Sequence, residues 1–351
     1  MNKNLVYENE NKKVLVIGLG QLGLPVAKYV KEKGFDVYGY DISQKAMERA
    51  EKVASINKIS DDSNFGEFDV FILCVSTHKA DDMFTPQIDS LLSIIEEKIS
   101  KEAKNNVLVS VESTIPRGIS RKIFEMVNHR LHVAHVPHRW YGLEEKEHGV
   151  NQLRVAGGVN GCCLNAAMQF YSNGTDYIGR DKMSIRINRG NRCNNDHNSC
   201  GIYTNAYGTG LGIPLYPVSN IEIAEITKIA ENAHRYLQIA FAEDLYLYCQ
   251  ANNINFPELR DALNTKWNVN ILEPRDGIGG HCLPKDVKMF LESSRSSKKS
   301  KILNAAIDVD RDYRRHLQAK GIVIQEVNKV EKEEKLNPLL TKKFGFKNSL
   351  N

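Results

Sequence analysis

The sequence predicts an α/β protein in which a doubly wound parallel sheet is followed by a helical central domain. Two patterns predict this class. In the first half of the chain, short apolar runs rich in β-branched residues alternate with stretches of helical periodicity, as in parallel sheets covered on both faces. In the second half, one helical pattern continues from about residue 219 to 252. At about 150 residues per domain, 351 residues allow two domains and an appendage.

The composition excludes several classes of protein. Hydrophobic residues make up 42% and charged residues 26%, which suits a packed core. The net charge of +4 is too small to indicate a nucleic-acid partner. No apolar run approaches the ~20 residues that a membrane helix needs, and the first residues have no apolar core of a secretory signal. Seven cysteines, an odd number, are expected to be reduced thiols in a cytoplasmic protein.

The first expected strand, residues 13–18, leads into a glycine-rich turn and a helix over 24–33. Gly18 suits a tight turn, Gly20 lets the backbone approach a pyrophosphate, and Gly23 allows close packing of helix on strand. A second strand over 36–40 ends at Asp41, which can accept hydrogen bonds from a ribose.

These features predict a Rossmann-type domain that binds NAD. The carboxylate of Asp41 repels a 2′-phosphate, so NAD is favoured over NADP. The alternative is a glycine-rich turn in an unrelated α/β domain. The residues expected at the first turn are Gly18, Gly20, Gln21, Leu22, Gly23 and Asp41.

Further strands are expected over 69–75 and 107–111, with a helix over 87–99. Ligands of doubly wound sheets bind at the carboxyl ends of the strands. The candidate site residues at these ends, by position alone, are Val75, Ser76, Thr77, Glu112 and Thr114. Ordinary polar strand ends remain the alternative for each of them.

Four histidines recur every third residue, but we expect no metal there. A strand over 131–137 would point them to alternating faces, so His129, His132, His135 and His138 could not converge. Residues 172–210 are rich in Asn and Gly and read as an irregular insertion. Its candidate ligands, Cys193, His197 and Cys200, have no C-x-x-C spacing, and a metal is not predicted.

The long helix is expected to begin at a capping box over 219–222. At 1.5 Å per residue it would be about 50 Å long, which suits a spine between domains or between the subunits of a homodimer. Lys228 and Asn232 lie four residues apart and share one face. By themselves they could be a solvated surface pair.

Residues 277–286 bring a thiol into a glycine-rich turn. Gly279 and Gly280 leave room for a substrate beside Cys282, and a basic neighbour can favour the nucleophilic thiolate. A buried thiol in a tight turn is the alternative.

Taken together, these motifs resemble the UDP-glucose/GDP-mannose dehydrogenase family, and most of all its UDP-N-acetylmannosamine 6-dehydrogenase branch. The resemblance runs from about residue 12 to 320 outside the insertion. It rests on the glycine turn, on Glu112–Pro116, Arg154–Gly158, Lys228–Arg235, Asn264–Lys266 and Gly279–Pro284.

The resemblance implies oxidation of the C6 alcohol of a nucleotide sugar to the carboxylate with two NAD. It makes Cys282 the nucleophile, through a thiohemiacetal and a thioester, and Lys228 the cation that steadies the oxyanion. Asn232 and Asp286 would hold Lys228 and a water, and Thr114 would lie near the nicotinamide. The implied substrate contacts are Arg139, Lys228, Asn232, Gly279 and Gly280.

Two departures from the family pattern are visible. His138 stands where the family has the glutamate expected to act in thioester hydrolysis. A neutral histidine could take a proton near pH 7, but slow release of product is expected. In addition, the chain after residue 300 is too short for the family's third domain of about 100 residues, which is therefore expected to be largely absent.

The expected organisation is a NAD-binding domain over 1–215, a helical central and dimerisation domain over 216–300, and a remnant with a charged tail over 301–351. Two other functions stay open: a simple NAD-dependent alcohol or β-hydroxyacid dehydrogenase, and a degenerate NAD-binding dimer module without turnover.

Overall fold

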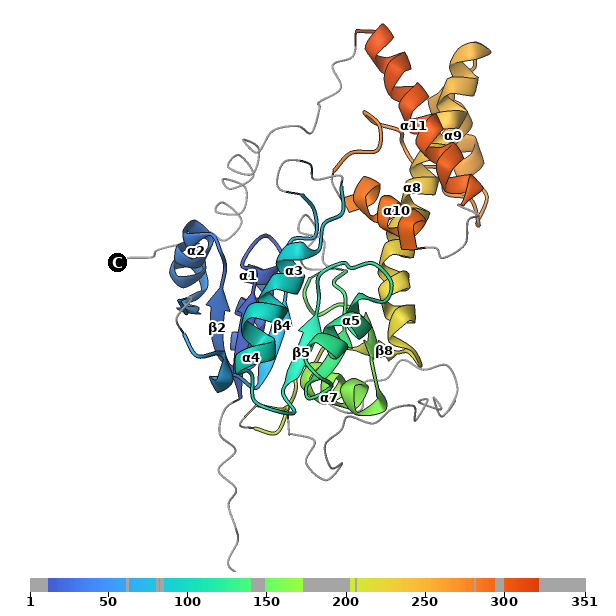
Figure 1. Cartoon of the computed structure of the whole chain (residues 1–351). Helices are drawn as coiled ribbons and strands as arrows, with labels where there is room; N and C mark the ends of the chain where they lie inside the picture. Colours follow the sequence, from blue (N-terminus) through green and yellow to red (C-terminus); the bar gives the residue numbers. More distant parts are fainter. Residues whose placement is uncertain are drawn as a thin grey trace, which may run out of the picture. The chain divides into compact units, whose positions relative to one another are not determined.

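The computed structural model describes residues 12–60, 63–79, 82, 85–139, 149–172, 203–205, 207–280, 282–293 and 300–321 (Figure 1). The chain divides into two compact units. The first consists of Met1–His234 and Lys285–Lys299, and the second of Arg235–Pro284 and Ser300–Asn351. The predicted insertion at 172–210 lies largely outside the described residues, as do Cys193, His197, Cys200 and the chain after 321.

The first unit is built on an eight-stranded sheet with the order β3-β2-β1-β4-β5-β6-β7-β8. The first six strands in this row follow the order of Rossmann domains, which confirms the predicted class. The strands are β1 (Lys13–Ile17), β2 (Asp36–Tyr40), β3 (Asn57–Lys58), β4 (Val70–Leu73), β5 (Leu108–Val111), β6 (His132–His135), β7 (Arg154–Gly158) and β8 (Leu215–Pro217).

Both faces of the sheet are covered because apolar residues occupy both sides of its strands. In β1, Val14 and Val16 enter one buried cluster, and Leu15 and Ile17 enter the other. On the first face lie α1 (Gly23–Glu32), α2 (Gln44–Ala54) and α7 (Gly161–Tyr171). On the second lie α3 (Asp89–Ile94), its continuation η2 (Ile95–Ile99), the short helix α4 (Ser100–Glu102) and α5 (Ile119–Met126). A 3-10 turn, η1 (Phe65–Glu67), precedes β4.

Two details differ from the prediction. Strand β7 runs antiparallel to β6, and β8 is parallel to β7, so the last two strands reverse the direction of the sheet. The helix expected over 87–99 begins at Asp89 and continues to Glu102, with a stretch of π-helix inside it.

The predicted long helix is α8 (Ile221–Ala251), of 31 residues, which starts in the first unit and ends in the second. Its first turn is capped by Asn220, whose Oδ1 accepts from the Glu222 amide at 3.0 Å. The capping box was expected to use Ser219 instead. The other helices are α9 (Phe256–Asn264), α10 (Cys282–Ser293) and α11 (Lys301–Ala319). No helix of the described part is long and apolar enough to cross a membrane.

Candidate active site

The turn between β1 and α1 has the geometry that its glycines predict. Gly18 has φ +89°, and a Cβ there would lie 2.6 Å from the carbonyl oxygen of Cys74. A Cβ on Gly23 would lie 1.7 Å from the carbonyl oxygen of Gly18. Around Gly20, by contrast, no described atom comes within 4 Å of the Cβ position. The backbone at Gly20 is therefore open to a ligand at the start of α1.

Asp41 is fixed beside this turn. Its Oδ2 accepts from the Leu19 amide at 2.6 Å and its Oδ1 from the Ser43 amide at 2.8 Å. Arg49 donates to the Leu19 carbonyl at 2.9 Å. An open glycine, a helix N-terminus and a carboxylate at the end of β2 fit the pyrophosphate and ribose of a dinucleotide.

The remaining candidates for the cofactor differ in exposure. Gln21 and Ser76 are exposed, Leu22 and Val75 are half-buried, and Thr77 is buried. Ser76 shares a hydrogen bond of 2.8 Å with Nδ1 of His78. Only some of these side chains can therefore touch a ligand without rearrangement.

Glu112, expected at the cofactor, lies in a closed polar cluster and is 1% exposed. Its carboxylate is paired with Nε2 of His138, lies 3.1 Å from Nη1 of Arg154, and accepts from the Tyr171 hydroxyl. The Cys74 thiol lies 3.9 Å away. Any effect of Glu112 on a coenzyme would therefore pass through these neighbours.

Burial and charge set the protonation of this cluster. Burial alone would raise the pKa of Glu112, but Arg154 and His138 outweigh it and lower that pKa to about 2. Burial, and then the nearby Arg154 charge, lower the pKa of His138 to about 4. Glu112 is therefore ionised and His138 neutral near pH 7. His138 is a weaker base there than the sequence suggested, because its conjugate acid is so easily deprotonated.

A second polar group joins helices α8 and α10 to the end of β4, all within the first unit. Asn232 donates to Oδ2 of Asp286 at 2.5 Å, and Lys285 donates to Oδ1 of Asp286 at 2.6 Å. Lys285 also reaches the Thr77 hydroxyl at 3.4 Å. Asp286 is 1% exposed, and each of its two carboxylate oxygens accepts one of these hydrogen bonds. The structure thus brings together Asn232 and Asp286, and it pairs Asp286 with Lys285.

Lys228 lies one turn before Asn232 on α8 and is half-buried. Its charge contributes to lowering the pKa of His135 and of His138. Thr114, at the end of β5, is also half-buried. Arg139, expected to bind substrate, instead forms an ion pair with Glu231 and donates to the Leu153 carbonyl at 3.1 Å.

In the second unit, helix α11 holds the glycine-rich turn that precedes Cys282. The Ile278 amide donates to Oδ1 of Asp310 at 2.8 Å, and Arg314 donates to the Ile278 carbonyl at 2.7 Å. Gly277 has φ +94° and lies against the Arg314 guanidinium. Gly279, Gly280 and Cys282 follow and are exposed, and Cys282 is the first residue of α10.

Sequence reasoning missed the partners that position these groups. Arg154 and Tyr171 complete the Glu112 cluster, and Asp310 and Arg314 hold the turn. One sequence signal could have indicated such a partner. Arg154 is the first residue of an otherwise apolar strand, and a buried arginine needs a buried anion beside it. The other contacts join residues that are far apart in the sequence, and no local pattern announces them.

Comparison with known proteins gives two family matches. Residues 222–312 match the UDP-glucose/GDP-mannose dehydrogenase family, central domain. Residues 1–87 match the NAD binding domain of D-isomer specific 2-hydroxyacid dehydrogenases. The second match agrees with the glycine turn, and both agree with the order of the motifs along the chain.

Individual relatives point the same way. A UDP-N-acetyl-D-mannosamine dehydrogenase of Methanococcus maripaludis is 28% identical over 306 residues, which cover 82% of this chain and 63% of the relative. One from Campylobacter jejuni is 27% identical and covers 86% and 72%. The solved UDP-D-ManNAc dehydrogenase from Pyrococcus horikoshii has the same fold, with a TM-score of 0.68 at 24% identity, covering 88% of this chain and 70% of that one.

The chain spans 63% of the length of the Methanococcus relative, so the match does not extend over that whole enzyme. Within the matched part, the Rossmann unit comes first and the central domain follows on α8, in the order that the sequence motifs indicated. Residues 222–312 therefore resemble the central domain of the UDP-glucose/GDP-mannose dehydrogenase family, and 82% of the chain is similar to the UDP-N-acetyl-D-mannosamine dehydrogenase of Methanococcus maripaludis.

Proposed function

We propose that this protein is an NAD-dependent nucleotide-sugar 6-dehydrogenase. It would oxidise the C6 hydroxyl of a substrate of the UDP-N-acetylmannosamine or UDP-glucose type to a carboxylate. The observation that carries the proposal is the bonded series from Thr77 through Lys285 and Asp286 to Asn232. It ties the strand end beside the glycine turn to the helix face that bears Lys228. The names of the relatives support the class of substrate.

Bound NAD would supply the hydride acceptor for both oxidation steps. The open backbone at Gly20 and the start of α1 would hold its pyrophosphate, and Asp41 its ribose. The Asp41 carboxylate disfavours a 2′-phosphate, so NAD is preferred to NADP. Val75, Ser76 and Thr77 would line the nicotinamide side.

Cys282 would act as the nucleophile. As the first residue of α10 it lies at the positive end of a helix, which favours the thiolate. The alcohol first loses a hydride and a proton to give the aldehyde. The thiolate then adds to the carbonyl carbon to form a thiohemiacetal, loss of a second hydride gives the thioester, and water releases the acid and the thiol.

The polar residues of α8 and α10 would stabilise these steps. The Lys228 ammonium would stabilise the oxyanion that forms on the oxygen of the original C6 hydroxyl group. Asn232 and Asp286 would fix Lys228 and a water, and Thr114 would lie near the reacting carbon. The substrate would contact Arg139, Lys228, Asn232, Gly279 and Gly280, and Arg139 must then exchange its bond to Glu231 for one to substrate.

Hydrolysis of the thioester would be the slow step. A histidine with a pKa of about 4 is a poor acceptor of a proton from water, and His138 also faces Glu112. We therefore expect a burst of NADH followed by slow turnover.

The decisive assay follows NADH release with a panel of UDP- and GDP-hexoses and counts NADH per sugar. Two NADH per acid formed are expected. Cys282→Ser should abolish acid formation, whereas Cys249→Ser, at a buried thiol of α8, should not. Acid formation by Cys282→Ser at the native rate would contradict the mechanism.

A second candidate is a simple alcohol or β-hydroxyacid dehydrogenase, favoured by the match of residues 1–87 to a hydroxyacid dehydrogenase domain. It predicts one NADH per substrate and no loss in Cys282→Ser. A third candidate, a degenerate NAD-binding module without turnover, is favoured by the buried, neutral His138 and the engaged Arg139. It predicts NAD binding without reduction by any sugar of the panel.

We also propose a cytoplasmic homodimer formed through α8. Ile223, Ile226, Thr227 and Ala230 recur at helical spacing along a surface hollow of this helix, and Ile223 is 44% exposed. Ile223→Glu should convert the dimer to a monomer in sedimentation equilibrium. The five described cysteines form no disulfide, which suits a reducing compartment.

A further inference from the structure

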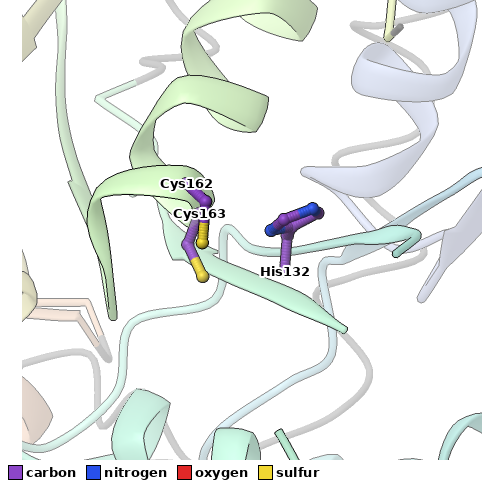
Figure 2. A group of neighbouring side chains, drawn as sticks. All are labelled: His132, Cys162 and Cys163. Carbon is purple, nitrogen blue, oxygen red and sulfur yellow. The ribbon is translucent and has the colours of Figure 1, made fainter. Parts of the chain in front are cut away.

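Three possible metal ligands lie close together in the first unit. None of them belongs to the glycine turn or to the hydrogen-bonded group around Asp286. They are His132 in β6 and the adjacent Cys162 and Cys163 in the first turn of α7 (Figure 2). One nitrogen of the imidazole and both sulfur atoms lie within 4.8 Å of one another. His132 and Cys163 are buried and Cys162 is half-buried.

From this juxtaposition we propose that His132, Cys162 and Cys163 bind a zinc ion. Zn²⁺ prefers thiolate and imidazole ligands at about 2.3 and 2.0–2.1 Å in tetrahedral geometry, which sets the ligand atoms roughly 3.6–3.8 Å apart. Each pair of donor atoms therefore needs to approach by at most about 1.2 Å. The half-buried Cys162 leaves the fourth position within reach of water.

The surroundings suit the charge of such a site. Both thiols lie in the first turn of α7, directly after its N-cap Asn160, where the helix favours the thiolate form. Binding would release the two thiol protons, and two thiolates neutralise Zn²⁺. The Tyr203 ring packs edge-on against His132 with ring centroids 5.9 Å apart and restricts the imidazole.

Two other uses of these thiols fit less well. Adjacent residues have Cα atoms 3.8 Å apart, below the 4.4–6.8 Å usual for a disulfide, so a bridge between Cys162 and Cys163 is disfavoured. The other group of possible ligands, Cys74, Glu112 and His138, already has the Arg154 cation 3.1 Å from its carboxylate, and burial raises the pKa of its thiol.

The test uses the full chain purified without chelators. Zinc content is measured by mass spectrometry, and the metal-free protein is titrated with Zn²⁺ against a chromophoric chelator and with Co²⁺ by its thiolate charge-transfer band. One equivalent of Zn²⁺ is expected. Cys162→Ser and His132→Asn should each weaken zinc binding by at least about 100-fold. The matched variant Cys249→Ser should bind as the wild type does.

Circular dichroism of the metal-free variants checks that each is folded, and Cys162, being half-buried, is the milder of the two sites. Absence of tight binding in the wild type would overturn the proposal. So would unchanged affinity in either variant, because the ion would then be held elsewhere. None of these outcomes depends on dehydrogenase activity.

Discussion

At the scale of single residues, the glycines after β1 have two roles. Gly18 and Gly23 allow backbone segments to pack closely, whereas Gly20 leaves space for a ligand to approach the backbone. Ala at position 23 would place a Cβ 1.7 Å from the Gly18 carbonyl, whereas Ala at position 20 would meet no described atom within 4 Å. We predict that Gly23→Ala lowers the free energy of unfolding by about 3 kcal/mol or more, because backbone must shift. Gly20→Ala should unfold as the wild type does and bind NADH at least about tenfold more weakly, since its methyl group occupies the approach to the pyrophosphate.

Urea unfolding and NADH fluorescence titration measure the two effects on the same proteins. If Gly20→Ala bound NADH normally, the pyrophosphate would not lie at this turn, and the assignment of the coenzyme site would be wrong.

A buried histidine gives the first unit an acid-sensitive point. Burial lowers the pKa of His135 to about 3, from an ordinary value of 6.5. Below pH 6.5 the unfolded chain binds a proton that the folded chain does not, so stability is lost as the pH falls from 6.5 toward 3. Between pH 7 and pH 5 this one residue should cost about 2 kcal/mol of unfolding free energy. His135→Val should remove that part of the loss, whereas His234→Gln, at an exposed position, should retain it.

Some residues of the candidate site could be predicted from the sequence. The others could not, because their contacts and pKa values depend on the folded structure. The roles of Gly18, Gly23 and Asp41 could be predicted because all three residues lie within one βαβ unit, whose pattern is local in the sequence. The hydrogen bond between Asn232 and Asp286 was not predicted, because 54 residues separate them. The low pKa of His138 could not be foreseen, since it follows from burial beside Arg154.

At the scale of elements, α11 acts on the cysteine turn from outside the motif. Arg314 forms an ion pair with Asp310 at i, i+4 and donates to the Ile278 carbonyl, so one side chain links the helix and the turn. Arg314→Ala should cost about 1–3 kcal/mol in unfolding free energy and raise hydrogen exchange over residues 277–280. The matched Arg315→Ala, at an exposed arginine of the same helix, should change stability by no more than about 0.5 kcal/mol.

Hydrogen-exchange mass spectrometry separates the two arginines directly. Equal exchange over 277–280 in both variants would show that the turn holds its shape without α11.

The elements themselves were more predictable than their directions. Helices α8 and α11 and strands β1, β2, β4 and β5 follow from periodicity, which is a local property. The reversal at β7 does not, because a buried apolar strand reads alike in either direction. The cap of α8 at Asn220 was also missed, since Ser219 and Asn220 are both good capping residues.

At the scale of the whole molecule, the two units are expected to respond to pH in opposite directions. The first loses stability in acid through its buried histidines. The second contains Glu243, a fully buried carboxyl of α8 whose pKa is raised to about 9, by burial first and then by the charge of Asp310. Arg314 lowers that pKa and Tyr236 lies nearby. The chain as a whole should therefore be most stable at an intermediate pH.

Between neutral and mildly alkaline pH, Glu243 gives the more specific test, because its pKa of about 9 lies in that range. Between pH 4.5 and about 9 the folded chain keeps a proton on Glu243 that the unfolded chain has lost, so stability falls as the pH rises, by at most about 1.4 kcal/mol per pH unit. In Glu243→Gln the side chain at position 243 is uncharged at every pH. The unfolding free energy of this variant, measured in urea at pH 6 and pH 8, should therefore lose the pH dependence that Glu243 causes. Asp244→Asn, on the exposed side of α8, should keep the wild-type slope. A slope that persists in Glu243→Gln would mean that Glu243 is already ionised in the folded chain, which would contradict the prediction.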